Sequence, residues 1–157
     1  MKYFPIALRL KAKDILVVGG GKIAERKVLS LLEAKAKVLV IAPLVTKRLK
    51  DLYGQGKIRL FSRGVRRTDI KNVTFIIAAT DDKDTNKDVC GWARKLGIPV
   101  NVVDKTELCD FISVATLKID KALISVYTDG LDPKLSRDLK KYLRSRWDDF
   151  ISYRNKL

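Results

Sequence analysis

Three consecutive glycines near the start of the chain are the residues best suited to approach a phosphate group. They stand between an apolar run, 15–18, and a helix-forming segment, 22–33, and with Gly19, Gly21 and Ala24 at the key places they read G-x-G-x-x-A. In such a turn the first glycine allows the chain to turn tightly out of the strand, and the second lets the backbone approach a pyrophosphate. The alanine lets the helix pack closely on the sheet. The phosphates would then meet free N–H groups at the positive end of the helix dipole. The pattern predicts a dinucleotide-binding turn, with a purely structural glycine turn as the alternative.

Two further loops are expected at the same edge of the sheet, because ligands of open α/β sheets lie outside the carboxyl ends of the strands. After the fourth apolar run, Ala79 is small enough for a cofactor to lie flat against the backbone, and Thr80 offers a hydroxyl. We expect Asp81 to cap the helix that follows rather than to bind a ligand. The fifth run ends at residues 101–104, which include Val102, and this end is the third loop of the predicted crevice.

Asp104 is the residue that this arrangement singles out for proton transfer. It follows the fifth apolar run, where it is expected to point toward the crevice. Since the chain has no histidine, a carboxylate at this place is the natural group to accept a proton beside a hydride transfer. An ordinary loop aspartate is the alternative, and position alone gives the two interpretations equal weight.

The second apolar run ends differently from that of many NAD-binding domains. Those domains place an acidic residue there for the ribose hydroxyls, whereas this chain continues with Pro43 and Leu44. These two residues would line the adenosine side with apolar surface and backbone. Lys47 and Arg48 lie a little further on and could meet a ribose phosphate, so the sequence leaves NADP open beside NAD.

Composition narrows the classes of protein to which the chain can belong. Its 157 residues suit one globular domain or one domain with a small appendage. No apolar run approaches the roughly 18 residues that span a bilayer, and no signal peptide is evident, so we expect a cytoplasmic protein. Cys90 and Cys109 lack metal-like spacing, which with the absence of histidine excludes an ordinary zinc site; two reduced thiols are expected. The net charge of +15 favours a polyanionic partner.

Apolar runs alternate with helical patterns in the order typical of a doubly wound α/β domain. Several runs are continuously apolar, as strands buried on both faces of a parallel sheet should be. The expected strands are Ile15–Val18, Val38–Ile41, Lys57–Phe61, Val73–Ala79 and Val100–Val103. The expected helices are Lys22–Glu33, a short one near Lys47–Leu52, and Asp84–Leu96, with Gly97 as its C-terminal signal. The fold class is therefore α/β, with a Rossmann-like doubly wound parallel sheet assigned to residues 1–112.

The pattern changes in the last third of the chain. Phe111–Leu117 and Ala122–Thr128 are expected to form a hairpin, and Asp132 and Pro133 to begin a helix. One face of that helix is apolar and aromatic, and it comprises Leu135, Leu139, Tyr142, Leu143, Trp147, Phe150 and Ile151. Such a face needs a partner; a second copy of the chain is preferred, and packing on the chain's own sheet is the alternative. Residues 113–157 are therefore predicted to be a small hairpin-plus-helix dimerisation element.

Several segments resemble the N-terminal module of siroheme synthases. They are Tyr3–Ile6, Val17–Lys27, Ile77–Asp82, Val100–Asp104 and Cys109–Ile112, and they occur in the family's order and spacing. The family comprises precorrin-2 dehydrogenases, some of which also act as sirohydrochlorin ferrochelatases. The resemblance implies NAD-dependent oxidation of precorrin-2 to sirohydrochlorin, and a homodimer. It further implies that Lys22, Ile23, Pro43 and Leu44 contact NAD and that Asp104 is essential for catalysis.

The implied substrate also accounts for the charge of the chain. Precorrin-2 is a tetrapyrrole ringed by carboxylates, so a cleft rich in Lys and Arg suits it and the charge requires no nucleic acid. The chain departs from the family at residues 129–133, which read Asp-Gly-Leu-Asp-Pro where Gly-Gly-x-Ser-Pro is usual. Two other functions stay open: a non-catalytic module that senses NAD, and a basic protein that binds nucleic acid with strong salt dependence.

Overall fold

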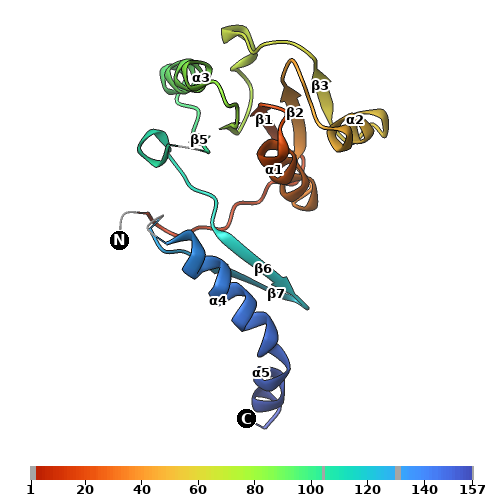
Figure 1. Cartoon of the computed structure of the whole chain (residues 1–157), viewed down its shortest axis with the longest axis vertical. Coiled ribbons are helices and arrows are strands. Elements are labelled where there is room, and N and C mark those ends of the chain that lie inside the picture. The colour runs from red at the N-terminus through yellow and green to blue at the C-terminus, as the bar shows by residue number, and fades with distance from the viewer. Residues whose placement is uncertain (1–2, 104, 130–131, 157) are drawn as a thin grey trace. The chain divides into compact units, whose positions relative to one another are not determined.

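The computed structural model describes residues 3–103, 105–129 and 132–156. The chain divides into two compact units (Figure 1). The larger unit is formed by residues 6–112, and in the smaller unit the start of the chain, up to Pro5, joins the part that begins at Ser113. From sequence, residues 1–112 were predicted to form the Rossmann domain, which would include the first five residues.

The larger unit is built on a parallel sheet in which the strand order is β3-β2-β1-β4-β5. The strands are β1 (Asp14–Val18), β2 (Lys37–Ile41), β3 (Arg59–Phe61), β4 (Phe75–Ala78) and β5 (Val100–Val102). The order reverses between β1 and β4, where successive crossovers run toward opposite edges of the sheet. Ligands of doubly wound sheets bind beside such a reversal. The predicted Rossmann-like fold is confirmed.

Helices cover both faces of this sheet. Helices α1 (Lys22–Glu33) and α2 (Lys47–Gly54) pack on one face, and α3 (Lys83–Lys95) packs on the other. Successive residues of β1 alternate between the two sides, with Val17 in the α1 layer and Leu16 in the α3 layer, and both are fully buried. Burial on both sides explains why the strands are continuously apolar in sequence.

The third and fourth strands each begin two residues later than their apolar runs predicted. Lys57 was expected in the third strand, but its N–H donates to Leu52 O at 3.0 Å and so closes the end of α2. The fourth strand begins at Phe75 rather than Val73, after Asn72 adopts a left-handed φ of 57°. Both corrections have the same cause, because turn or loop geometry takes up the first two residues of each predicted strand.

The smaller unit contains an antiparallel hairpin and two helices. Strands β6 (Ala115–Ile119) and β7 (Ala122–Val126) pair from Ala115 opposite Val126 to Ile119 opposite Ala122. Helix α4 (Pro133–Ser145) packs against this hairpin and is followed by α5 (Trp147–Arg154). Asp132 accepts a hydrogen bond from Leu135 N–H at 2.7 Å, so the predicted N-cap is confirmed.

The C-terminal helix predicted from sequence is in fact two helices. The break falls at Arg146, where φ is −105° and ψ is 9°. Just before it, the Ser145 hydroxyl donates to Tyr142 O at 2.8 Å, and such local side-chain bonds compete with helical pairing. The Trp147 indole N–H then donates to the Asp120 carboxylate in the hairpin turn. The helix is redirected by contacts that its apolar periodicity does not reveal.

Helix α3 offers a direct test of the predicted C-terminal signal. Gly97 has a φ of +65°, and Ile98 N–H bonds to Ala93 O at 3.0 Å beside it. We expect Gly97→Ala to lower the free energy of unfolding by about 1–2 kcal/mol, the cost of a left-handed L-residue. The control is Gly91→Ala inside α3, where an added Cβ meets no atom within 4 Å; it should raise stability by about 0.5–1 kcal/mol. Urea unfolding of both variants measures the difference, and shifts of the same sign would contradict this account.

Candidate functional site

The loops that leave the carboxyl ends of the strands are held together by backbone hydrogen bonds. Each of four bonds joins the residue just after one strand to the end of its neighbour, so the loops begin in register along one edge. The pairs are Ala42 N to Phe61 O (3.2 Å), Gly19 N to Ile41 O (3.0 Å), Ala79 N to Val18 O (2.7 Å) and Val103 N to Ala78 O (3.1 Å). The structure thus brings the three loops predicted from sequence to one edge of the sheet.

Gly19 is required by both conformation and space. Its φ is +120°, a value that L side chains rarely adopt. A Cβ at this position would lie 2.2 Å from Ala79 O, so the turn after β1 and the loop after β4 touch through backbone alone. The role that the sequence assigned to Gly19, a tight turn out of the strand, agrees with this geometry.

Gly20 is a residue that sequence reasoning missed. The fingerprint allows any residue at this place, yet a Cβ on Gly20 would lie 2.0 Å from Leu44 O. The Gly20 carbonyl also accepts a hydrogen bond from Thr46 N–H at 2.9 Å. The turn after β1 is therefore packed against the turn after β2. The signal was present in the sequence as a third glycine where two would satisfy the pattern.

Gly21 has the opposite environment, because nothing lies within 4 Å of an added Cβ. It is the N-cap of α1 and supplies no side-chain hydrogen bond to the helix. The other helices of the larger unit are capped, α2 by the Thr46 hydroxyl and α3 by the Asp82 carboxylate. Helix α1 therefore presents N–H groups without a side-chain cap beside open space, which suits a pyrophosphate. The glycine turn fits a dinucleotide.

The residues expected to contact NAD lie around this open space. Lys22 is the first residue of α1 and is exposed. Ile23 is 46% exposed and Leu44 is 86% exposed, beside an exposed Pro43. The contact between Gly20 and Leu44 brings the two pairs of residues to the same part of the edge. Large apolar side chains so open to solvent are suited to covering a flat ring or a ribose.

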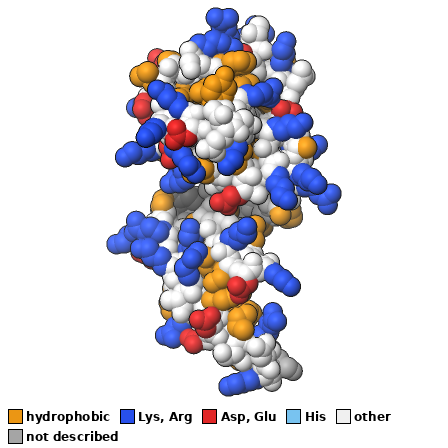
Figure 2. All heavy atoms as spheres, turned by 90° about the vertical axis from the view of Figure 1, so that its right-hand side faces the viewer, with side chains coloured by type: hydrophobic (Ala, Val, Ile, Leu, Met, Phe, Trp, Pro, Cys, Tyr) orange, Lys and Arg blue, Asp and Glu red, His pale blue; other side chains and the backbone are white. Residues whose placement is uncertain are grey.

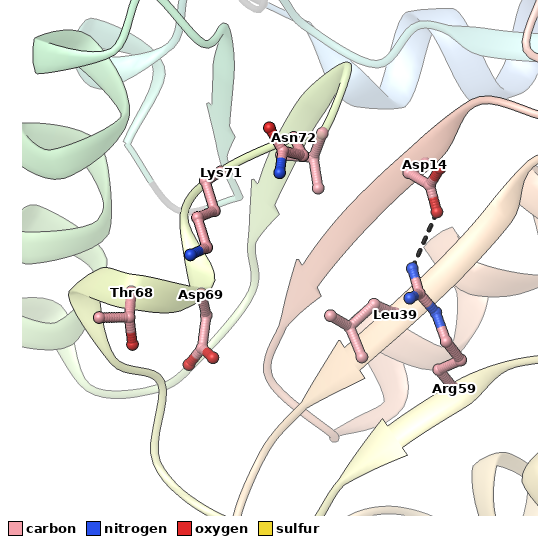
Figure 3. Close-up of a pocket in the computed structure, with 8 residues that line it drawn as sticks. Asp14, Leu39, Arg59, Thr68, Asp69, Lys71 and Asn72 are labelled. Carbon is pink, nitrogen blue, oxygen red and sulfur yellow. Dashed lines mark hydrogen bonds and ion pairs between the residues drawn. The ribbon is translucent and has the colours of Figure 1, made fainter.

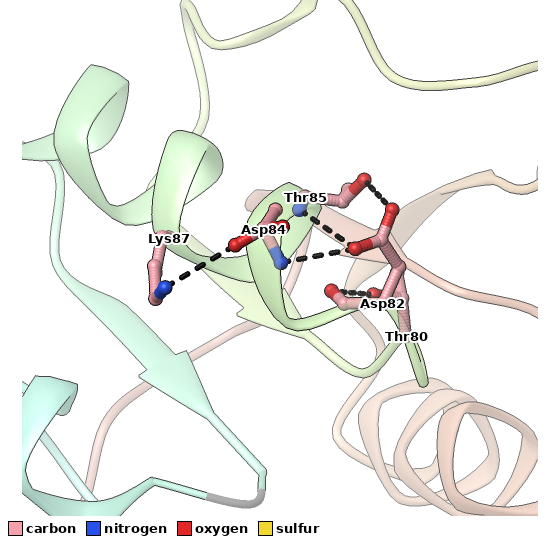
Figure 4. A network of polar contacts seen from close by, with 5 residues as sticks. All are labelled: Thr80, Asp82, Asp84, Thr85 and Lys87. Atoms are coloured by element: carbon pink, nitrogen blue, oxygen red, sulfur yellow. Dashed lines mark hydrogen bonds and ion pairs between the residues drawn. The ribbon is translucent and has the colours of Figure 1, made fainter.

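The loop after β4 is rigid because its polar groups bond to one another (Figure 4). The Thr80 hydroxyl lies 2.8 Å from Asp82 O and 2.9 Å from Asn86 Oδ1, and the buried Asn86 amide donates to Thr80 O at 2.9 Å. Thr80 is therefore positioned by Asn86, and its hydroxyl keeps only acceptor capacity for a ligand. Ala79, 8% exposed, offers mainly backbone, as expected for a surface on which a cofactor lies flat.

Asp82, not Asp81, caps α3. Its carboxylate accepts from Asp84 N–H at 2.9 Å and Thr85 N–H at 3.3 Å, and from the Thr85 hydroxyl at 2.8 Å. The hydroxyl bond, followed by the two backbone bonds, lowers the pKa of Asp82. The sequence favoured Asp81, so this prediction was wrong by one residue, because the turn after β4 is longer than the apolar run indicated.

The end of β5 is built from backbone rather than from exposed side chains. Val102 is 2% exposed, and both its N–H and its carbonyl lie 3.1 Å from the Cys109 sulfur. Its place among the cofactor-binding residues stays a prediction. Asp104, the expected proton acceptor, lies outside the described residues.

Lys27 is a further titratable group that sequence reasoning did not single out. It lies on α1 one turn beyond Ile23, and burial, with a smaller contribution from the neighbouring Arg26, lowers its pKa to about 8. A smaller electrostatic contribution from Cys109 opposes this shift. A partly desolvated cation here is suited to a carboxylate.

Two cavities of the larger unit lie at the opposite edge of the sheet, and Figure 3 shows one of them. One of about 310 Å³ is lined by Asp14, Leu39, Arg59, Thr68, Asp69, Lys71, Asn72 and Val73. Asp14 and Arg59 begin β1 and β3 and form an ion pair of 2.8 Å within it. Since dinucleotides bind at the carboxyl ends of strands, this cavity is not the cofactor site.

The surface carries many cations (Figure 2), with Lys and Arg side chains across most of the face shown. Within the described ranges, no group of three or more His, Cys, Asp or Glu side chains could hold a metal ion. Cys90 and Cys109 are free thiols. No helix in the same ranges is long and apolar enough to cross a membrane.

Gly20 and Gly21 predict opposite effects of substitution. We expect Gly21→Val to remove NAD binding with little loss of stability, because the side chain fills open space where the pyrophosphate would lie. Gly20→Ala should lower the free energy of unfolding by about 1–3 kcal/mol or more, as overpacking does. Fluorescence titration with NAD and thermal unfolding separate the two effects. Unchanged NAD affinity in Gly21→Val would rule out this turn as the pyrophosphate site.

Comparisons with known proteins agree with this site. The family model described as "Putative NAD(P)-binding" matches residues 6–115. Siroheme synthase of Methylococcus capsulatus is 44% identical over 140 residues, which cover 89% of this chain and 30% of that protein. Siroheme synthase of Thioalkalivibrio sulfidiphilus is 40% identical over 151 residues, which cover 96% of this chain and 30% of that protein. The chain thus spans 30% of the length of these relatives.

A solved structure extends the similarity beyond the Rossmann fold. It is described as "SirC, precorrin-2 dehydrogenase", has 30% sequence identity and a TM-score of 0.80, and the match covers 92% of this chain and 71% of that one. The prediction of a nicotinamide dinucleotide as cofactor is confirmed at the level of the family. The chain belongs to the NAD(P)-binding family that is shared by the matched region of siroheme synthases and the precorrin-2 dehydrogenase SirC.

Proposed function

We propose that this chain catalyses the NAD-dependent oxidation of precorrin-2 to sirohydrochlorin. The observation that supports this most strongly is the similarity to SirC over 92% of the chain, together with a glycine turn whose open side suits a pyrophosphate. The reaction removes two electrons and two protons from precorrin-2, as one hydride and one proton. Bound NAD supplies the hydride acceptor. The chain must therefore bind NAD, orient the macrocycle and accept or release the proton.

In this proposal, each of these tasks belongs to particular residues at or near the carboxyl edge of the sheet. The N–H groups at the start of α1 bind the pyrophosphate, and Ile23 and Leu44 cover the adenosine side with apolar surface. Asp104, which follows β5 in the sequence, accepts the proton. Lys27 and the excess of cations bind the carboxylates of the substrate, which favours association through long-range attraction. Two free thiols suit a reducing cytoplasm, where we propose that the protein acts.

Asp104 is tested by two substitutions. General-base help is worth about 10²–10⁴ in rate, so Asp104→Ala should lower the turnover of precorrin-2 by about that factor with NAD affinity nearly unchanged. Asp104→Asn should be almost as slow, since an amide keeps the shape but takes no proton at neutral pH. The assay is anaerobic incubation with precorrin-2 and NAD, followed by the absorbance of sirohydrochlorin. Added ferrous ion in the same assay tests the metal insertion that the resemblance implies for some family members.

The control for this pair is Asp88→Ala, which removes an exposed aspartate of α3 and should leave turnover unchanged. Full activity of Asp104→Asn would mean that the carboxylate only anchors the substrate and that water takes the proton. Full activity of Asp104→Ala would remove Asp104 from the reaction.

We also propose that the chain forms a homodimer through its smaller unit. Helix α4 packs on the hairpin through its buried Ser136 and the half-buried Lys140 and Leu143. Other apolar side chains of α4 remain exposed, with Leu135 53% and Tyr142 57% exposed. Further large apolar side chains of this unit are also exposed, namely Leu123, Leu139, Phe150 and Tyr153. We infer that these side chains form one apolar surface, which marks an interface and which a second copy would bury on both sides.

Replacing an exposed apolar residue of α4 by a charged one tests the proposed homodimer. Wild type should show twice the chain mass in light scattering at micromolar concentration, and Leu135→Asp should shift it toward the monomer. An acidic residue in the first turn of a helix is favourable, so α4 should persist in this variant. The control is Leu96→Asp in the larger unit, because Leu96 is equally exposed, at 56%. A wild-type monomer, or a dimer unaffected by Leu135→Asp, would contradict the proposal.

A further inference from the structure

The outer edge of β5 is closed by side chains rather than by another strand. β5 pairs with β4 on one side, so the backbone groups of Val100 and Val102 point outward on the other. Val100 N–H donates to the Asp110 carboxylate at 2.9 Å, and Val100 O accepts from Asp110 N–H at 2.9 Å. Val102 N–H and Val102 O both lie 3.1 Å from the Cys109 sulfur. Two adjacent residues thus satisfy all four outward groups of the strand.

The Cys109 thiol is suited to this double role. Burial raises its pKa, so the sulfur carries its proton at neutral pH. A protonated thiol can accept from Val102 N–H and donate to Val102 O, or to Lys105 O at 3.3 Å. An alanine at this position could do neither, whereas a serine hydroxyl could do both at shorter reach.

The side chain of Asn101, the middle residue of β5, bonds to the same following part of the chain, at Cys109 and Phe111. Its side-chain NH₂ donates to Phe111 O at 2.9 Å and lies 3.5 Å from the Cys109 sulfur. Asn101 is 5% exposed, and its Oδ1 is the one buried side-chain oxygen or nitrogen of the described residues without a hydrogen-bond partner. Leaving a buried acceptor unsatisfied costs free energy, so the amide is held here for its two donated bonds. Asn101, Cys109 and Asp110 together form what we call the β5 clamp.

The β5 clamp closes a short loop. Val102 and Cys109 are joined at the sulfur, and the residues between them include a single helical turn, Thr106–Leu108. Asp104 belongs to this stretch of the sequence, although it lies outside the described residues. A group that transfers a proton must be held to within a fraction of an ångström. The base of the loop that carries Asp104 is fixed by the clamp.

We propose that Asn101, Cys109 and Asp110 are positioning residues for Asp104, and that the clamp sets the rate of proton transfer by fixing this loop. This inference rests on the proposed dehydrogenase function. A purely structural role, protection of an open strand edge, is the competing explanation. The two differ in one respect: a positioning residue loses its effect on turnover when Asp104 is absent, and a structural residue does not.

The test uses pairs of variants that remove or keep the clamp's hydrogen bonds. Displacement of a reacting group by about 1 Å can cost about 10²-fold, so Cys109→Ala and Asp110→Ala should each lower kcat by about 10- to 100-fold. KM for NAD should change little. Cys109→Ser and Asp110→Asn retain an acceptor for the strand N–H groups and should restore most of kcat. The matched control is Ser136→Ala, which removes a buried hydroxyl that bonds to Thr128 in the smaller unit and lies outside the clamp and its loop.

The decisive variant combines Cys109→Ala with Asp104→Ala. If the clamp acts through Asp104, the double variant turns over no more slowly than Asp104→Ala alone. Hydrogen exchange at Val100 and Val102 checks independently that the alanine variants open the strand edge in a folded protein. If Cys109→Ala does not fold, Asp110→Ala and Asp110→Asn provide the same comparison.

Three results would overturn the proposal: wild-type kcat in the alanine variants, additive losses in the double variant, or losses that follow the unfolded fraction. If the wild type itself oxidises no precorrin-2, the proposed function fails and this inference fails with it. That result is distinct from an active wild type with active alanine variants, which refutes the clamp alone.

Discussion

Backbone touches backbone at the carboxyl edge of the sheet, and the rest of the larger unit depends on this contact. A Cβ on Gly19 would lie 2.2 Å from the carbonyl of Ala79, and one on Gly20 would lie 2.0 Å from that of Leu44. No side chain fits at either place, so the turn after β1 is packed between the loops that follow β4 and β2. The position of each loop relative to the others, and hence the shape of the dinucleotide site, follows from these two glycines.

The larger unit treats backbone groups that a regular fold leaves without partners in two ways. At the start of α1 no side chain bonds to the free N–H groups, and the space beside Gly21 is open. At the outer edge of β5, by contrast, Asp110 and Cys109 bond to every outward group of the strand. Donors are thus left without a side-chain cap at the proposed pyrophosphate site and are satisfied at the β5 clamp.

The smaller unit places its apolar residues in an unusual way. Helix α4 contacts the hairpin through a face that includes Ser136 and Lys140, while Leu135 and Tyr142 remain exposed. A helix that packed only for its own stability would turn its apolar stripe inward. The outward stripe is explained by the proposed homodimer, in which a second copy would cover it. The larger unit needs no such partner, since both faces of its sheet are already covered.

Sequence patterns that extend over only a few residues were enough to predict much of this fold. Continuous apolar runs, the glycine turn and the cap signals at Asp132 and Gly97 act over a few residues, so the order of strands and helices and the strand-turn-helix geometry at Gly19 and Gly21 could be predicted. Tertiary structure alone decided the need for glycine at position 20, the cap at Asp82 and the β5 clamp. Gly20 depends on a contact with Leu44, which is distant in sequence. The cap at Asp82 depends on the length of the turn after β4, and the β5 clamp depends on contacts made across a loop. Periodicity records which side of an element is apolar, whereas those contacts exist only after the elements have packed.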